Sequence, residues 1–307
     1  MNKNKRLDET LNMALEYIIG YNDDFTFDDV ALALYELHMD RNILYKKYAN
    51  KNIDKIHTWE DIPLMPSYEF NEQMVELDMN TSMPYPGVLF KHARFRHYMR
   101  NTDHYRASIL RGLKDTLFDG LYPGPLYKVI DLNHQSNNDN ITYYTELLGD
   151  LMSYDRRTIN AYLTSPEDFI SLLKKFVDEP MIIIGHLDNF ERIYDGLETI
   201  KLHPESKIIK INNTNKNDSQ YGLAKKFHIK NENVITMYQH PLLSSQLYHH
   251  GVGNNKFSIP STVKFRSDNA KKTKRTGVVD LANVWSCPFI RINDATVVDL
   301  FEVQFCP

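Results

Sequence analysis

Apolar residues recur at helical intervals in three segments near the start of the chain. Between residues 7 and 21 they are spaced as on one face of a helix, and Gly20 marks its end. Thr26 is a suitable N-cap for a second helix that runs through Arg41 and beyond. A third helix is predicted at 105–117, ended by Gly120. We expect the first two helices to cover a sheet edge.

Short apolar, β-branched runs alternate with amphipathic segments in the middle of the chain. The runs are residues 128–132, 181–184, 207–211 and 234–237, and the helical patterns are 165–177, 189–200 and 219–227. Such repetition predicts a parallel sheet whose crossovers cover both faces. Strands buried on both faces need not alternate apolar with polar residues, which agrees with the uniformly apolar character of these runs. After residue 237 the pattern becomes mixed β, with runs at 262–266, 277–281 and 289–293.

The predicted fold class is α/β, a mostly parallel sheet flanked by helices, with an N-terminal helical layer. The segment Ile62-Pro63-Leu64-Met65-Pro66 cannot be helical, because each proline removes a donor and pushes its predecessor toward extended backbone. It is therefore interpreted as a rigid connector. We divide the chain into a helical layer (1–58), an α/β sheet subdomain (59–237) and a β-rich C-terminal part of the same large domain (238–307).

Composition places the chain among folded, soluble proteins. Hydrophobic residues make up 42% and charged residues 25%, and the net charge of −4 provides no field that would gather nucleic acid or an anionic membrane. Two cysteines are too few for a disulfide framework. The longest apolar run, 180–185, is far too short to span a bilayer, and no apolar leader follows the basic N-terminus. A cytoplasmic location is expected.

A family resemblance rests on the order of several motifs. After the connector come Arg96-His97-Tyr98-Met99-Arg100 and Tyr105-Arg106-Ala107-Ser108, then Val234-Ile235-Thr236-Met237-Tyr238, and finally Gly277-Val278-Val279-Asp280-Leu281 and Pro288-Phe289-Ile290-Arg291-Ile292-Asn293-Asp294. This order resembles the acyl-protein synthetases of the bacterial luciferase system, within the adenylate-forming ligases. The resemblance implies the fold of their large N-terminal domain and a ligand site beyond the carboxyl ends of the parallel strands. The residues expected to line that site are Gly185, His186, Tyr238, Gln239, His240 and Asp294.

The chain departs from the family pattern where ATP would bind. The glycine-rich phosphate loop is replaced by Leu89-Phe90-Lys91-His92-Ala93-Arg94-Phe95, and side chains with a Cβ resist the positive φ angles that cradle phosphate. After Tyr238, Gln239-His240-Pro241-Leu242 stands where Gly-x-Thr-Glu is expected, so the magnesium-holding carboxylate is missing. The family's small lid domain, with its catalytic lysine, would lie beyond Pro307. We interpret the chain as a degenerate relative, and expect neither ATP nor magnesium as a cofactor.

Two further candidates concern anions and acyl transfer. Lys91, Arg94, Arg96 and Arg100 interleave with aromatic residues and could hold an anion such as a pantetheine phosphate; the alternative is a solvated strand edge and loop. The resemblance suggests that Cys306 carries an acyl group as a catalytic thiol. The motif around Cys306 does not match, however, and an ordinary terminal cysteine is the alternative.

Other reactive residue types show no functional pattern. His240, His249 and His250 lack a further ligand at zinc spacing, so no metal site is predicted. Ser244 and Ser245 stand close to His240, but nothing in the sequence supplies the orienting group or the oxyanion hole of a nucleophilic serine.

The leading function is an acyl-protein-synthetase-like protein that binds an acyl group, an acyl carrier or a partner acyl-processing enzyme, without activating the acid with ATP. The resemblance suggests an acyl-CoA reductase-like partner, while the small net charge and the short apolar runs predict neither nucleic acid nor membrane as a partner. An active AMP-forming carboxylate ligase, a Cys306-dependent acyl transferase and a purely structural subunit are the alternatives, because a fold alone does not decide between them.

Overall fold

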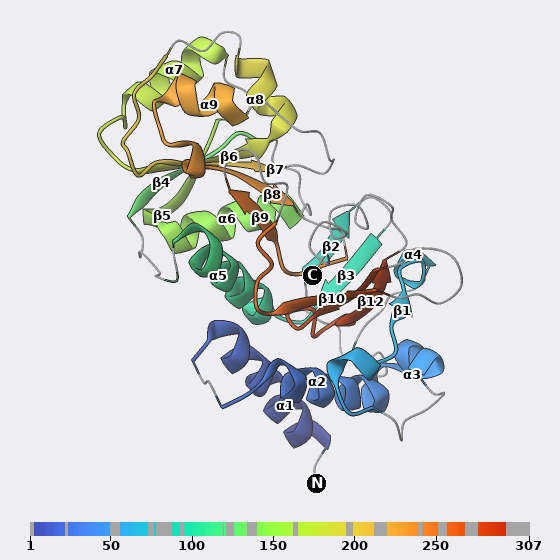
Figure 1. Cartoon of the computed structure of the whole chain (residues 1–307). Coiled ribbons are helices and arrows are strands. Elements are labelled where there is room, and N and C mark those ends of the chain that lie inside the picture. The colour runs from blue at the N-terminus through green and yellow to red at the C-terminus, as the bar shows by residue number, and fades with distance from the viewer. Residues whose placement is uncertain are drawn as a thin grey trace. The chain divides into compact units, whose positions relative to one another are not determined.

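The structure, a computed structural model, describes residues 3–21, 24–49, 56–72, 77, 88–92, 95–118, 120, 126–133, 140–161, 165–194, 199–211, 220–238, 242–250, 257–267 and 276–292 (Figure 1). The chain forms two compact units. The first unit comprises Met1–Asp115, His240–Gln246 and Ile259–Pro307, and the second unit comprises Thr116–Gln239 and Leu247–Ser258. Each unit combines distant segments, whereas the division made from the sequence was into consecutive ones.

A six-stranded sheet forms the centre of the second unit. Its strand order is β5-β4-β6-β7-β8-β9. The strands are β4 (Tyr127–Asp131), β5 (Ser153–Asn160), β6 (Met181–His186), β7 (Lys207–Ile211), β8 (Val234–Tyr238) and β9 (Leu247–His250). All neighbours pair in parallel except β8 and β9, which are antiparallel. The four predicted strands and their parallel arrangement are confirmed.

Helices cover both faces of this sheet. They are α6 (Asn140–Met152), α7 (Pro166–Lys174), α8 (Leu187–Tyr194) and α9 (Gln220–Phe227). Figure 1 shows α7, α8 and α9 on one face and α6 on the other. Phe169, Phe190 and Phe227 project from the three helices on the first face and are buried with Ile183 and Ile208 of the sheet in one apolar cluster. Burial of such side chains is the main force that holds these layers together.

The first unit begins with α1 (Lys3–Ile19), α2 (Phe27–Arg41) and α3 (Ile43–Ala49). Thr26 caps α2 as predicted: its Oγ1 accepts from Asp29 N at 3.2 Å, and the Asp29 carboxylate accepts from Thr26 N at 2.9 Å. These helices cover a small sheet of order β1-β12-β11-β10. The rings of Tyr35, His38 and Tyr45 contact Phe289 of β12, with centroids 5.4 to 6.4 Å apart. The predicted N-terminal helical layer is therefore present.

The remaining elements of the first unit are short, apart from α5. They are η2 (Trp59–Asp61), β1 (Met65–Pro66), α4 (Glu69–Glu72), β2 (Val88–His92), β3 (Phe95–Met99), α5 (Asp103–Leu117), β10 (Val263–Ser267), β11 (Thr276–Asp280) and β12 (Phe289–Ile292). The proline-rich connector ends in β1, which pairs in parallel with β12. In the described ranges, no helix is both long and apolar enough to cross a membrane.

Candidate functional site

The carboxyl ends of the parallel strands bring three of the predicted ligand residues to one edge of the sheet. Gly185 and His186 end β6, and Tyr238 ends β8, with β7 between these strands. Gly185 sits where the chain has no room for a side chain, because a Cβ there would lie 2.8 Å from Leu132 Cβ. The other three predicted residues, Gln239, His240 and Asp294, lie outside the described residues.

A buried carboxylate organises the end of β4 at this edge. Asp131 Oδ1 accepts hydrogen bonds from Asn133 N at 2.9 Å and Asn133 Nδ2 at 2.7 Å, and Oδ2 accepts from Thr145 Oγ1 of α6 at 2.7 Å. Asp131 and Asn133 are almost completely buried. Hydrogen bonds to a buried carboxylate are strong, so they fix the turn that follows the strand.

Asn133 also connects β4 to β6. Its Oδ1 accepts from the backbone N–H of His186 at 2.8 Å, while Asn189 Nδ2 of α8 donates to Leu132 O at 3.0 Å. Asn133 therefore orients the backbone from which the partly exposed imidazole of His186 projects. At the end of β8, the ring of Tyr238 packs against Phe257 with centroids 5.9 Å apart. The edge thus combines one fixed polar strip with an aromatic surface.

The first unit contains a second buried carboxylate, which the sequence analysis did not single out. Asp280 Oδ2 accepts from the backbone N–H groups of Ser244 and Ser245 at 2.8 and 2.9 Å. Its Oδ1 accepts from Ser245 Oγ at 2.7 Å and from Ala282 N at 3.1 Å. Burial raises the pKa of Asp280, and its hydrogen bonds with Ser245, Ala282 and Ser244 oppose that shift.

Asn283 extends this network to the neighbouring loops. Its Nδ2 donates to Leu242 O at 3.1 Å and to Cys287 O at 2.9 Å, and its Oδ1 accepts from Ser286 Oγ at 2.6 Å and Ser244 Oγ at 3.2 Å. Ser244 and Ser245 are buried. They therefore hold loops together and are not placed to attack a substrate. The available sequence signal was an acidic residue at the end of an otherwise apolar run, Gly277-Val278-Val279-Asp280.

The thiols and histidines offer no reactive centre in the described part of the chain. Cys287 is fully buried, and burial raises the pKa of its thiol to about 12, so it is protonated at neutral pH. Cys306 lies outside the described residues. Across the described ranges, no three His, Cys, Asp or Glu side chains come together as metal ligands.

The predicted anion-binding residues fall on and beside a β-hairpin. Lys91 of β2 and Arg96 of β3 are direct register partners, and Arg94 lies outside the described residues. Arg100 follows β3 and is used locally: its guanidinium carbon lies 5.5 Å from the centre of the Trp285 ring, and Nη2 donates to Leu77 O at 3.5 Å. A cluster of all four cations stays a prediction.

Comparisons with known proteins find matches among solved structures only. No protein-family model matches the chain, and no curated protein matches its sequence. A 2-hydroxyisobutyryl-CoA ligase in an open conformation, in complex with 2-HIB-AMP and CoA, matches with a TM-score of 0.58 and 8% identity, over 86% of this chain and 68% of that one. The same ligase in its postadenylation state with 2-HIB-AMP matches with a TM-score of 0.58 and 9% identity, over 86% and 62%.

A coronafacic acid ligase from Pectobacterium brasiliense is 15% identical over 76% of this chain, with a TM-score of 0.44. The chain spans 45% of the length of that ligase. At these identities the likeness concerns the fold alone: the chain has an α/β fold, with a mostly parallel sheet flanked by helices, like that of the two 2-hydroxyisobutyryl-CoA ligase structures.

Proposed function

We propose that the protein binds an acyl group, free or on a carrier, at the carboxyl edge of the parallel sheet, and that it does not activate a carboxylic acid with ATP. It would then resemble the acyl-protein synthetases in fold and in ligand class while lacking their adenylation step. The observation that carries this proposal is the hairpin formed by β2 and β3.

The hairpin leaves little chain where the resemblance places a phosphate loop. β2 and β3 pair antiparallel from Val88↔Met99 to His92↔Phe95, so only two residues separate the last register partners. A phosphate cradle needs several successive N–H groups that converge on the anion, and glycines permit that backbone conformation. Two non-glycine residues between paired strands are a poor substitute for such a cradle.

The position that corresponds to the magnesium-binding carboxylate supports the same proposal. Leu242 stands there, its side chain is fully buried, and its carbonyl oxygen accepts from Asn283 Nδ2 at 3.1 Å. An aliphatic side chain cannot ligate a metal ion, and the hard magnesium ion requires oxygen ligands. Leu242 is therefore a core residue of the first unit.

The edge of the parallel sheet has the composition that an acyl ligand requires. Pockets for such ligands combine apolar walls with a small number of fixed polar groups. Here Phe257, which packs on the buried ring of Tyr238, supplies aromatic surface, and the partly exposed His186 supplies a polar group whose backbone Asn133 holds in place. Open α/β sheets bind ligands beyond the carboxyl ends of their strands.

Two measurements test the proposal on the full chain. ATP–pyrophosphate exchange with a panel of carboxylic acids and magnesium should stay at background. Isothermal titration with acetyl-, octanoyl- and palmitoyl-CoA should detect binding of at least one acyl length, and His186→Ala should weaken that binding while His57→Ala, at an exposed histidine, should not.

The alternatives give different results. Exchange above background would show an active ligase and overturn the proposal. A thioester adduct in the intact mass, lost in Cys306→Ser, would show an acyl transferase. Binding of none of the acyl probes would favour a purely structural subunit.

A further inference from the structure

The end of α1 packs on α5 in the first unit and frames a small polar site. Ile18 and Leu15 of α1 form an apolar cluster with Ala107 of α5 and Ala282. Gly20, in the left-handed region with φ +72°, ends α1, and its N–H donates to Glu16 O at 3.1 Å. The face of α5 that carries Ala107 continues one turn later at Arg111.

Arg111 is held through one side of its guanidinium group only. Its Nε donates to Asp115 Oδ2 at 2.6 Å, and the two side chains are 21% and 26% exposed. Within the described ranges, this is the only hydrogen bond that the guanidinium group makes. The N–H groups of Nη1 and Nη2 are therefore available to donate to a ligand. Nη1 lies over Gly20, where a Cβ would be 2.5 Å away. Glycine thus makes the room in which the guanidinium group lies.

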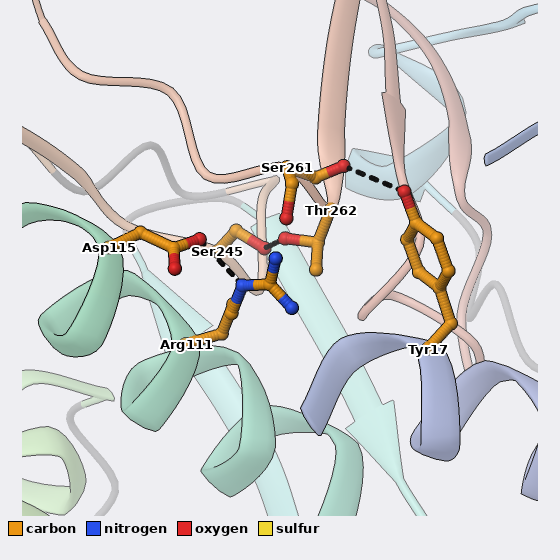
Figure 2. Close-up of polar contacts among 6 residues, drawn as sticks. All are labelled: Tyr17, Arg111, Asp115, Ser245, Ser261 and Thr262. Carbon is orange, nitrogen blue, oxygen red and sulfur yellow. Dashed lines mark hydrogen bonds and ion pairs between the residues drawn. The ribbon is translucent and has the colours of Figure 1, made fainter. Parts of the chain in front are cut away.

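Hydroxyl-bearing residues from three other segments lie on the side of α5 toward which Arg111 points (Figure 2). Tyr17 OH donates to the carbonyl oxygen of Ser261 at 3.4 Å, a long bond that a stronger acceptor could replace. Next to Ser261, Thr262 Oγ1 lies 3.4 Å from Ser245 Oγ. Figure 2 shows the guanidinium group of Arg111 directed toward Ser245, Ser261 and Thr262, with the Tyr17 ring across from it.

Other contacts confirm that these segments lie close together. Ser108, one turn before Arg111 on α5, has its Oγ 3.0 Å from Ser245 Oγ. Tyr17 precedes Gly20 by one helical turn. Burial raises the pKa of Tyr17, and the positive charge of Arg111 offsets part of that shift. The guanidinium group therefore lies between the end of α1 and the chain around residue 261.

We propose that Arg111, Tyr17 and Ser261 form a binding site for a phosphate monoester. The free edge of the guanidinium group presents two N–H donors in the fork geometry that matches phosphate oxygens. Tyr17 and Ser261 add hydroxyl donors from two other segments. Donors on three segments suit the three terminal oxygens of a phosphate monoester, whereas a carboxylate has only two oxygens to offer. Asp115 fixes the guanidinium plane, and its carboxylate lies on the Nε side.

This inference stands apart from the proposed acyl site, because it uses none of the same residues. It holds whether the phosphate belongs to a small ester or to the 3′-phosphate of coenzyme A. Arg111 near the C-terminus of α1 also complements the helix dipole, so a purely structural arginine is the competing explanation. The experiment must separate the two.

The test titrates the full chain with inorganic phosphate, coenzyme A and 3′-dephospho-coenzyme A. Arg111→Ala should weaken phosphate binding by about tenfold or more, because a charge-assisted bond is lost. Tyr17→Phe, which keeps the ring, should weaken it by a few fold. Arg192→Ala removes the same charge from an exposed helix position and should leave binding unchanged. Thermal denaturation of each variant checks that it is folded.

Binding of coenzyme A that is lost with the 3′-phosphate and in Arg111→Ala would identify that phosphate as the occupant. Binding of inorganic phosphate alone, again dependent on Arg111, would identify a small monoester. The proposal would be overturned if the unmodified chain, Tyr17→Phe and Arg111→Ala bound phosphate with equal affinity. It would also be overturned if the unmodified chain bound none of the probes.

Discussion

Asp280 and Ser245 are joined by two hydrogen bonds that close a loop onto a strand end. Ser245 N donates to Asp280 Oδ2 at 2.9 Å, and Ser245 Oγ donates to Asp280 Oδ1 at 2.7 Å. Both residues are fully buried. A pair of this kind in a water-excluded site couples the position of the 242–246 segment to β11, because neither group has solvent as an alternative partner.

Asp280→Ala should therefore destabilise the protein by about 3 kcal/mol or more, since it leaves several buried N–H groups without an acceptor. Asp8→Ala removes an exposed carboxylate from α1 and should change the free energy of unfolding by less than about 0.5 kcal/mol. Urea unfolding followed by circular dichroism measures both. Comparable small effects of the two substitutions would contradict a structural role for Asp280.

His38 makes stability depend on pH. Its Nε2–H donates to Val284 O at 3.0 Å, and Nδ1 accepts from Asn42 Nδ2 at 3.2 Å, so the folded state holds the neutral ring. Burial lowers its pKa from 6.5 to about 3. Between those values the unfolded chain binds the extra proton, so stability falls as pH falls. From pH 7 to pH 5 the loss attributable to His38 is about 2 kcal/mol.

The comparison of the unmodified chain with His38→Gln isolates this contribution. Chemical unfolding at several pH values between 5 and 7 should show a shallower pH dependence for the variant, even if its stability at pH 7 is lower. His104, whose pKa burial also lowers, acts in the same direction in both proteins and cancels in the comparison. Parallel profiles for the two proteins would refute the assignment to His38.

Substitutions at two glycines distinguish the effect of backbone strain from the effect of a steric clash. Gly20 and Gly120 both have positive φ, +72° and +82°. A Cβ at position 20 would meet Arg111 Nη1 at 2.5 Å, whereas position 120 has nothing within 4 Å. Gly120→Ala should cost about 1 kcal/mol from strain alone. Gly20→Ala should carry a similar strain and, in addition, displace the guanidinium group and weaken phosphate binding. Unchanged phosphate affinity in Gly20→Ala would contradict the proposed site.

Much of the fold was predictable because its signals are local. The apolar runs of β4, β6, β7 and β8 indicate a sheet buried on both faces. Thr26 and Asp29, three residues apart, form the capping pattern that marks the start of α2. The strand β5 was missed, because it lies at the edge of the sheet and most of its side chains are exposed. Its sequence, Ser153-Tyr154-Asp155-Arg156-Arg157-Thr158-Ile159-Asn160, therefore carries no apolar run.

The site was less predictable, since its contacts join residues far apart in the chain. Asp280 meets Ser245 across 35 positions, and Tyr17 meets Ser261 across 244. No periodicity reports such pairings. Arg111 belonged to a helix that the sequence predicted correctly, but nothing local distinguishes an arginine with a free guanidinium edge from a solvated one. The fold resemblance directed attention to strand ends, which is why Gly185 and His186 were predicted and Arg111 was not.

The turn after β4 gives a last prediction, based on a buried amide that cannot be replaced by a carboxylate. Asn133 Nδ2 donates to Asp131 Oδ1 at 2.7 Å, and both residues are buried. Asn133→Ala removes the hydrogen bonds of the side-chain amide and should lower the free energy of unfolding by about 2 kcal/mol. Asn133→Asp keeps the shape but sets two carboxylates against each other, so it should cost about 3 kcal/mol or more at pH 7.

The order of the two variants should depend on pH. In Asn133→Asp the repulsion raises a carboxyl pKa in the folded state, so folding takes up a proton and the variant gains stability relative to Asn133→Ala as pH falls toward 4. Urea unfolding of both variants at pH 7 and near pH 4.5 measures the gap, which should narrow at the lower pH. If Asn133→Asp were as stable as the unmodified chain at pH 7, the Asp131–Asn133 hydrogen bond could not be what fixes the carboxyl edge where the acyl ligand is proposed to bind.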